Sequence, residues 1–156
     1  MTENLTVRAA VHSEATAISS LAMRSKAHWG YSDEFMQACR EELTYSKSEI
    51  ESEHYEFFVC EAECRIVGFY ALKLTGPGDA ELEAVFVEPE MIGRGIGRRL
   101  IEHAKAKASN LGVRQIIVQG DPNAESFYEA AGGVRAGRRK SSSIPGRFLP
   151  IFRIDL

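Results

Sequence analysis

The chain has 156 residues and a mass of 17.3 kDa, which suits one domain with a single hydrophobic core. Its hydrophobic fraction of 44% and charged fraction of 26% exclude disordered and fibrous proteins, and its formal net charge of −3 argues against a dedicated nucleic-acid-binding protein. No apolar run reaches the roughly 18 residues of a membrane span, and the N-terminal segment lacks the apolar centre of a signal peptide. We therefore expect a single domain over residues 1–156 that is cytoplasmic and has no membrane or nucleic-acid partner.

The three cysteines predict neither a disulfide framework nor a metal site. They are odd in number, form no Cys-x-x-Cys pair and have no histidine pair nearby. Cys60 and Cys64 flank the short segment 61–63, so a hairpin there would bring them near each other and leave a disulfide as the alternative. We expect all three thiols to be reduced.

The first third of the chain predicts one strand and two helices. Apolar and polar residues alternate over residues 5–10, which is typical of a half-buried strand. Ser13 is expected to cap the helix that follows, and a second helix is expected over residues 33–44. The loop between these helices, residues 26–32, carries two large aromatic residues. The apolar residues of the first helix recur at helical spacing: Ala17, Ile18, Leu21 and Ala22.

The middle of the chain predicts antiparallel strands. Residues 55–62 and 65–74 form a hairpin pattern, and a Gly-Pro-Gly turn precedes a third strand over residues 80–87. Strict alternation along this third strand would place one set of side chains on one face: Leu82, Ala84 and Phe86. The opposite face would then carry Glu81, Glu83, Val85 and Val87.

The last third alternates helices and strands. A helix follows the glycine-rich segment 93–97 and ends at Gly112, a buried strand covers residues 113–119, and a second helix runs from residue 121 to residues 132–133. Short strands are expected near residue 134 and over residues 148–154. The buried stripe of the first of these helices is Ile96, Leu100, Ile101, Ala104, Ala108 and Leu111. The element order indicates a mixed α/β fold of the α+β type, because the antiparallel hairpins exclude a purely doubly wound sheet.

The glycine-rich segment is a candidate anion site. Gly93, Gly95 and Gly97 lie between a strand and a helix, so backbone N–H groups and the positive end of the helix point the same way. The segment is not a Walker A loop, since no Lys-Ser or Lys-Thr follows it. It does not match the dinucleotide fingerprint either, because Arg98 stands where the third glycine would fall. A turn needed only for backbone geometry is the alternative.

Two segments together resemble the GCN5-related N-acetyltransferase (GNAT) family. The family's pyrophosphate motif is Gln or Arg, two residues, Gly, any residue, then Gly or Ala; Gly95 and Gly97 match its small positions, while Ile92 replaces Gln or Arg. Residues 121–132 resemble the family's Asn-Ala, Phe-Tyr and Gly block, one helix and one strand further on. This resemblance implies a single domain with a central mixed, mostly antiparallel sheet of six to seven strands flanked by about four helices.

The resemblance also implies acetyl-CoA as the donor cosubstrate, no metal, and a primary amine on a small molecule or peptide as the acceptor. Pantetheine would lie where the strand 80–87 and the strand 113–119 part, paired with the backbone of Val85 and Val87 as a peptide pairs with a sheet edge. The residues implied in cofactor binding are Val85, Phe86, Val87, Ile92, Gly93, Arg94, Gly95, Ile96, Gly97, Arg98, Asn123, Phe127 and Tyr128.

Direct transfer requires a neutral amine and a proton for the departing thiolate. Only about one amine in a thousand is neutral at pH 7 when its pKa is near 10, so a carboxylate base would help. Glu81 matches the catalytic glutamate of the family's histone-modifying branch, and Glu83 is the second candidate base. Tyr128 matches the tyrosine that protonates the CoA sulfur. Exposed strand carboxylates and a core aromatic are the alternatives.

The acceptor side is less specified. In this family the loop between the first two helices walls the acceptor pocket, which implicates His28, Trp29 and Tyr31; packing against the sheet is the alternative, and His28 is a further candidate base. A basic run near the C-terminus could contact the adenosine 3′-phosphate or an acidic substrate, or be solvated: Arg135, Arg138, Arg139 and Lys140.

The leading hypothesis is therefore an acetyl-CoA-dependent N-acetyltransferase. A catalytically silent acetyl-CoA-binding regulatory module and an interaction subunit that uses the fold as a scaffold are the alternatives, and a homodimer is left open by the resemblance. Glu81 and Tyr128 favour the enzyme.

Overall fold

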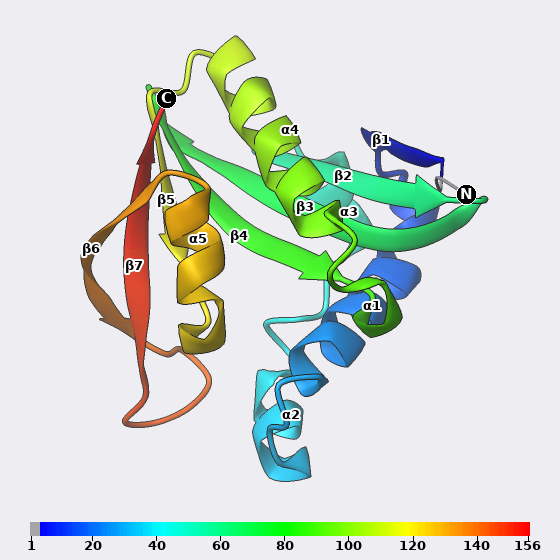
Figure 1. Ribbon diagram of the computed structural model, residues 1–156, viewed down its shortest axis with the longest axis vertical. Helices are drawn as coiled ribbons and strands as arrows, with labels where there is room; N and C mark the ends of the chain where they lie inside the picture. Colours follow the sequence, from blue (N-terminus) through cyan, green and yellow to red (C-terminus); the bar gives the residue numbers. More distant parts are fainter. Residues whose placement is uncertain (1–3) are drawn as a thin grey trace.

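The protein, described over residues 4–156 by a computed structural model, is built on one seven-stranded sheet (Figure 1). Residues 1–3, the start of the expected domain, lie outside the described residues. The strands are β1 (Leu5–Ala9), β2 (Tyr55–Ala62), β3 (Arg65–Gly76), β4 (Asp79–Val87), β5 (Gln115–Gln119), β6 (Gly133–Lys140) and β7 (Phe148–Asp155), in the order β1-β2-β3-β4-β5-β7-β6. Among the strands of the described residues, only β4 and β5 pair in parallel, which confirms the mixed, mostly antiparallel sheet.

Within residues 4–156, five α-helices and three single turns of 3-10 helix connect the strands. The helices are α1 (Ala15–Ala27), α2 (Asp33–Cys39), α3 (Lys47–Glu51), α4 (Ile96–Asn110) and α5 (Glu125–Ala130), and the 3-10 turns are η1 (His12–Glu14), η2 (Pro89–Met91) and η3 (Pro122–Ala124). Helix α3 was not predicted, and α2 ends at Cys39, earlier than the expected residue 44. Ser13 does not cap α1; instead, the Glu14 carboxylate accepts a hydrogen bond of 2.9 Å from the Val11 N–H.

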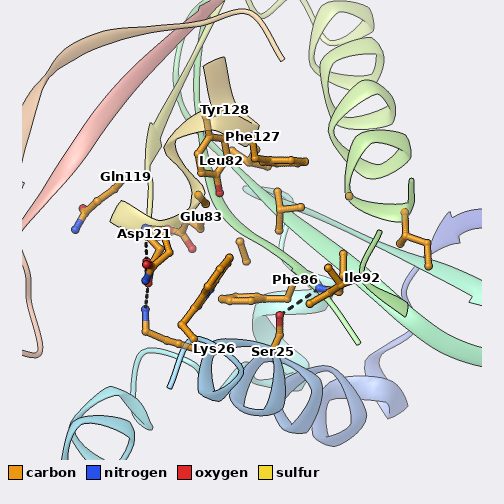
Figure 2. Close-up of a pocket in the computed structure, with 18 of the residues that line it drawn as sticks. Ser25, Lys26, Leu82, Glu83, Phe86, Ile92, Gln119, Asp121, Phe127 and Tyr128 are labelled. Atoms are coloured by element: carbon orange, nitrogen blue, oxygen red, sulfur yellow. Dashed lines mark hydrogen bonds and ion pairs between the residues drawn. The ribbon is translucent and has the colours of Figure 1, made fainter. Parts of the chain in front are cut away.

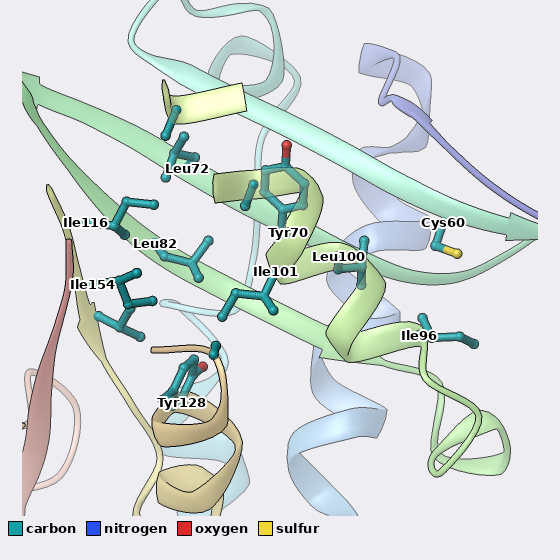
Figure 3. Packing of buried hydrophobic residues seen from close by; sticks show 14 of the residues in the cluster. Cys60, Tyr70, Leu72, Leu82, Ile96, Leu100, Ile101, Ile116, Tyr128 and Ile154 are labelled. Atoms are coloured by element: carbon teal, nitrogen blue, oxygen red, sulfur yellow. The ribbon is translucent and has the colours of Figure 1, made fainter. Parts of the chain in front are cut away.

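Two apolar clusters cover the two faces of the sheet. Helices α4 and α5 pack on one face around fully buried side chains such as Leu100 and Tyr70 (Figure 3), and α1 packs on the other around Ile18 and Phe69. The stripe expected for α4 is buried except for Leu111, which is 44% exposed because the helix has ended by that residue.

A β-bulge in β4 overturns the expected alternation along that strand. Ala84 pairs with Ala71 on β3, whereas Leu82 pairs with the next residue, Leu72. Glu83 is therefore an extra residue opposite no partner, and side chains beyond it point to the opposite faces from those that strict alternation predicts.

The bulge changes which side chains share a face. Leu82 packs in the cluster under α4 and α5 together with Val85 and Val87, whereas Ala84 and Phe86 pack in the cluster under α1. The prediction that Leu82, Ala84 and Phe86 lie on one face was thus wrong, because a period of two cannot reveal one inserted residue.

No helix within residues 4–156 is long and apolar enough to cross a membrane. The cysteines Cys39, Cys60 and Cys64 are free thiols, of which Cys64 is exposed in the turn between β2 and β3. Among the same residues, no three His, Cys, Asp or Glu side chains gather in a way that could hold a metal ion.

An ion pair links α1 to the residue that follows β4. The Arg24 guanidinium donates two hydrogen bonds of 2.8 and 2.7 Å to the Glu88 carboxylate, whose side chain is only 7% exposed. These bonds lower the pKa of Glu88. Arg65, which also pairs with Glu90, lies at 4.0 Å from the same carboxylate.

We expect Arg24→Gln to lower the free energy of unfolding by about 1–2 kcal/mol near neutral pH, since it leaves a buried carboxylate without its main donor while Arg24 itself is half exposed. The pKa of Glu88 is lower in the folded state, so the pair stabilises the fold at pH values above the ordinary carboxyl pKa. This contribution is lost as pH falls through the lowered pKa. Urea unfolding of the wild type and of Arg24→Gln, near neutral pH and at about pH 3, measures this contribution. A difference in the free energy of unfolding that is the same at both pH values would contradict the assignment. Arg65→Gln is the matched control with a smaller expected effect.

Candidate active site

The sheet opens between its two parallel strands. Strands β4 and β5 pair from Asp79 and Gln115 as far as Leu82 and Val118, and their pairing stops there, one residue before the bulge at Glu83. A cavity of about 680 Å³ lies at this opening, between the ends of β4 and β5, helix α1 and the start of α4 (Figure 2). The opening of the sheet thus creates a candidate site.

The edge of β4 that faces this cavity offers backbone groups. Just after β4, the Glu88 N–H donates a hydrogen bond of 2.8 Å to the Val67 carbonyl on β3. In an antiparallel pair every second residue forms such bonds, so Phe86 and Ala84 also direct their backbone groups to β3. By this alternation, Val85 and Val87 direct their N–H and C=O groups away from β3, toward the opening. The Val87 N–H lies 3.4 Å from the Ser25 hydroxyl oxygen, which is its partner in this structure.

The glycine-rich segment forms one wall of the cavity. Gly93 and Gly95 have φ angles of 88° and 79°, a backbone conformation that side chains with a Cβ rarely adopt. Helix α4 begins directly after Gly95, so the N–H groups of its first turn are not used by the helix itself. A Cβ on Gly97 would lie 3.1 Å from the Phe127 ring, so this glycine lets α4 and α5 approach each other.

Tyr128 on α5 is packed by its ring and offers its hydroxyl group to the cavity. Its ring lies against Phe152 and against Gly120, where a Cβ would come within 2.9 Å of it. Figure 2 shows the hydroxyl pointing into the cavity. Burial raises the pKa of Tyr128, which keeps the phenol protonated and able to donate a proton.

The two candidate bases differ in their surroundings, although both line the cavity. The Glu81 carboxylate accepts a hydrogen bond of 3.3 Å from Arg139 on β6. Glu83, at the bulge, has Lys73 at 4.0 Å, and burial raises the pKa of Glu83. A carboxylate with a raised pKa and a distant cation accepts a proton more readily than one held by a guanidinium.

A half-buried polar network around Asp121 closes one side of the cavity. The carboxylate accepts hydrogen bonds from the Tyr31 hydroxyl at 2.8 Å and the Asn123 N–H at 2.9 Å, and lies 3.4 Å from Lys26 and 3.6 Å from Arg147. Burial would raise the pKa of Asp121, but these bonds and the Lys26 charge outweigh it and lower the pKa. Burial, followed by the bond to Asp121, raises the pKa of Tyr31 to about 12.

Most of the residues predicted from the sequence meet in this one cavity. Those that line it are Glu81, Glu83, Val85, Phe86, Val87, Ile92, Gly93, Gly95, Ile96, Gly97, Arg98, Asn123, Phe127, Tyr128 and Trp29. Within residues 4–156, three candidates lie outside its lining: Arg94, His28 and Tyr31. Tyr31 reaches the site through Asp121, and the Asn123 side-chain amide donates to both of them.

Several lining or supporting residues were missed: Ser25, Lys26, Glu42, Tyr45, Gln119, Asp121 and Arg147. The sequence suggested Asp121 only as the start of a helix, and nothing local singles out Lys26 or Arg147, which lie 95 positions before and 26 positions after it. Only the fold brings them together.

A sheet that opens beside a bulged strand, with a glycine loop at the start of the following helix, is the architecture of the GNAT class of N-acetyltransferases. The family model described as an acetyltransferase (GNAT) domain matches residues 9–143. The chain belongs to this family and is an N-acetyltransferase.

The relatives cover at least 96% of the chain. A 5-NmdU N-acetyltransferase of Pseudomonas phage PaMx11 is 29% identical over 151 residues, 96% of this chain and 98% of that protein. The PaiA N-acetyltransferase of Thermoplasma acidophilum, solved in complex with coenzyme A, has a TM-score of 0.81 at 21% identity and covers 98% of this chain and 99% of its own. A GCN5-related N-acetyltransferase structure from Rhodopseudomonas palustris has the same TM-score of 0.81 at 21% identity, with 100% and 99% covered. These structures share the fold.

Proposed function

We propose that residues 1–156 form a single domain that transfers an acetyl group from acetyl-CoA to a primary amine. The observation that carries this proposal is the one continuous cavity that joins the glycine loop of α4 to Glu81, Glu83 and Tyr128. The edge of β4 at Val85 and Val87, where no strand is paired with it, would pair with the pantetheine amides, and the N–H groups after Gly95 would hold the pyrophosphate. Family membership and the coenzyme A complex of the Thermoplasma acidophilum structure support the choice of donor.

We assign the remaining steps of the transfer to side chains of this protein. We assign to Glu81 the binding of the acceptor ammonium, and to Glu83 the proton that this ammonium must lose before it attacks. The amine nitrogen then forms a bond to the acetyl carbonyl carbon, and a strand N–H at the bulge stabilises the oxyanion. The carbon–sulfur bond breaks, and Tyr128 gives its proton to the thiolate. Free thiols at all three cysteines suit a reducing compartment, so we propose that the enzyme acts in the cytoplasm.

The first test is thermal unfolding with and without saturating acetyl-CoA. At about one hundred times its Kd, a ligand stabilises the folded state by about 2.7 kcal/mol, which raises the Tm of a domain of this size by several degrees. NAD and ATP serve as controls and should leave the Tm unchanged. A Tm that does not move with acetyl-CoA would reject the assignment of the glycine loop.

The acceptor is then sought by measuring release of free CoA thiol with a panel of amines. The phage relative is named for 5-NmdU, so this compound belongs in the panel beside amino acids, amino acid amides and polyamines. Acetyl-CoA binding without thiol release for any amine would favour the regulatory module over the enzyme.

A further inference from the structure

A guanidinium from the edge of the sheet reaches across to the opening. Arg139 on β6 donates from its Nη1 atom to Glu81 Oε1 at 3.3 Å and to Gln119 Oε1 at 3.2 Å. Glu81 and Gln119 both line the cavity, on the two strands that part there. Arg138, the preceding residue, instead lies over the Phe148 ring at 4.5 Å. The two neighbouring arginines therefore have different surroundings, and Arg139 alone contacts the site.

The carboxylates near this opening already have cations beside them. Besides the Arg139–Glu81 pair, Glu83 lies 4.0 Å from Lys73, and Asp121 lies 3.4 Å from Lys26. An acceptor ammonium that binds Glu81 at Oε1 takes the place of Arg139 and leaves this guanidinium without its carboxylate. An acceptor that carries its own anion gives Arg139 a new partner.

We propose that Arg139 is a specificity residue of the acceptor site, and that the acceptor is an α-amino acid. This inference rests on the proposed function, because it needs Glu81 to bind the ammonium. Arg139 Nη1 and Glu81 Oε1 are in direct contact at 3.3 Å, so a small molecule that separates this pair and binds both residues would carry its ammonium and its anion close together. An ammonium and a carboxylate on the same carbon meet this requirement. Gln119 holds the guanidinium in place while its anionic partner changes.

The test compares each L-amino acid with its own amide. Purified wild type and Arg139→Gln are assayed for CoA thiol release, and kcat/KM is measured for the best amino acid and for its amide. The amine of the amide has a lower pKa than that of the acid, so the acid-to-amide ratio is compared between the two proteins; this comparison cancels intrinsic reactivity. We expect Arg139→Gln to lower the ratio by roughly tenfold, the effect of losing one charge-assisted hydrogen bond.

Two further variants separate this role from a general structural effect. Arg138→Gln, on the same strand but facing Phe148, should leave the ratio unchanged. Arg139→Lys keeps the positive charge but loses the planar guanidinium that can bind a carboxylate through two donors, so it should give an intermediate acid-to-amide ratio. Melting with acetyl-CoA should show the wild-type shift in all three variants.

The outcomes distinguish the two proposals. A wild-type ratio retained in Arg139→Gln, or efficient use of simple alkylamines and no use of any amino acid, overturns the role of Arg139 while leaving the acetyltransferase assignment standing. Failure of acetyl-CoA to shift the Tm overturns the proposed function and this inference with it.

Discussion

Replacing Glu83 with glutamine is expected to lower kcat/KM by roughly 10² to 10⁴, the range lost when a general base is removed. Glutamine keeps the size and hydrogen-bonding shape of the side chain at the bulge but cannot accept the proton. Acetyl-CoA should raise the Tm of this variant as much as that of the wild type, since we assign to Glu83 no contact with the donor.

The dependence of kcat/KM on pH tests whether Glu83 is the base. A base works only when deprotonated, so wild-type kcat/KM should fall as pH drops through the pKa of Glu83, which burial raises above the ordinary carboxyl value. In Glu83→Gln the decrease of kcat/KM around the pKa of Glu83, the acidic limb of the profile, should disappear. The remaining activity should then follow only the ionisation of the acceptor amine and increase with pH as more of the amine becomes neutral.

Glu81→Gln is the matched comparison, one position before Leu82 on the same strand. Because we assign ammonium binding to Glu81, this variant should raise the KM for the amine more than it lowers kcat, and it should keep the acidic limb. If the acidic limb disappears in Glu81→Gln and persists in Glu83→Gln, the two roles are exchanged. Glu81 matches the position of the catalytic glutamate in the histone-modifying branch of the family, so this exchange of roles is the main alternative to our assignment.

The parts of the site that sequence reasoning predicted are those encoded by neighbouring residues. Gly95 and Gly97 are two positions apart, and Phe127 and Tyr128 are adjacent, so a local pattern was sufficient to place them. The structure brings both patterns to one cavity. The family match over residues 9–143 confirms the membership that these short patterns predicted.

The features that were missed depend on register and on contacts between distant segments. The bulge at Glu83 depends on how β4 pairs with β3, which no single strand reveals. The Tyr31 hydroxyl reaches Asp121 across 90 positions, and Arg147 reaches Tyr31 across 116. These contacts follow from the folded sheet, so a residue such as Arg147 carries no local signal of its place beside the site.

Tyr128→Phe is expected to lower kcat by roughly 10², because the substitution removes the only proton that the tyrosine can give to the departing thiolate. The ring should keep its packing against Gly120 and Phe152, so the fold and the acetyl-CoA-induced rise in Tm should be retained. The raised pKa of Tyr128 keeps the phenol protonated across the working pH range, and the loss should therefore be similar at every pH tested near neutrality.

Tyr70→Phe is the matched control for this substitution. Its hydroxyl is hydrogen-bonded to His103 Nδ1 at 2.8 Å and takes no part in lining the cavity. Removing it should cost about 1 kcal/mol of stability, the value of one such bond, and leave kcat unchanged. Equal turnover of Tyr128→Phe and wild type would show that Tyr128 only packs the base of the cavity. The thiolate would then take its proton from water, and catalysis would depend on Glu81, Glu83 and the backbone of β4.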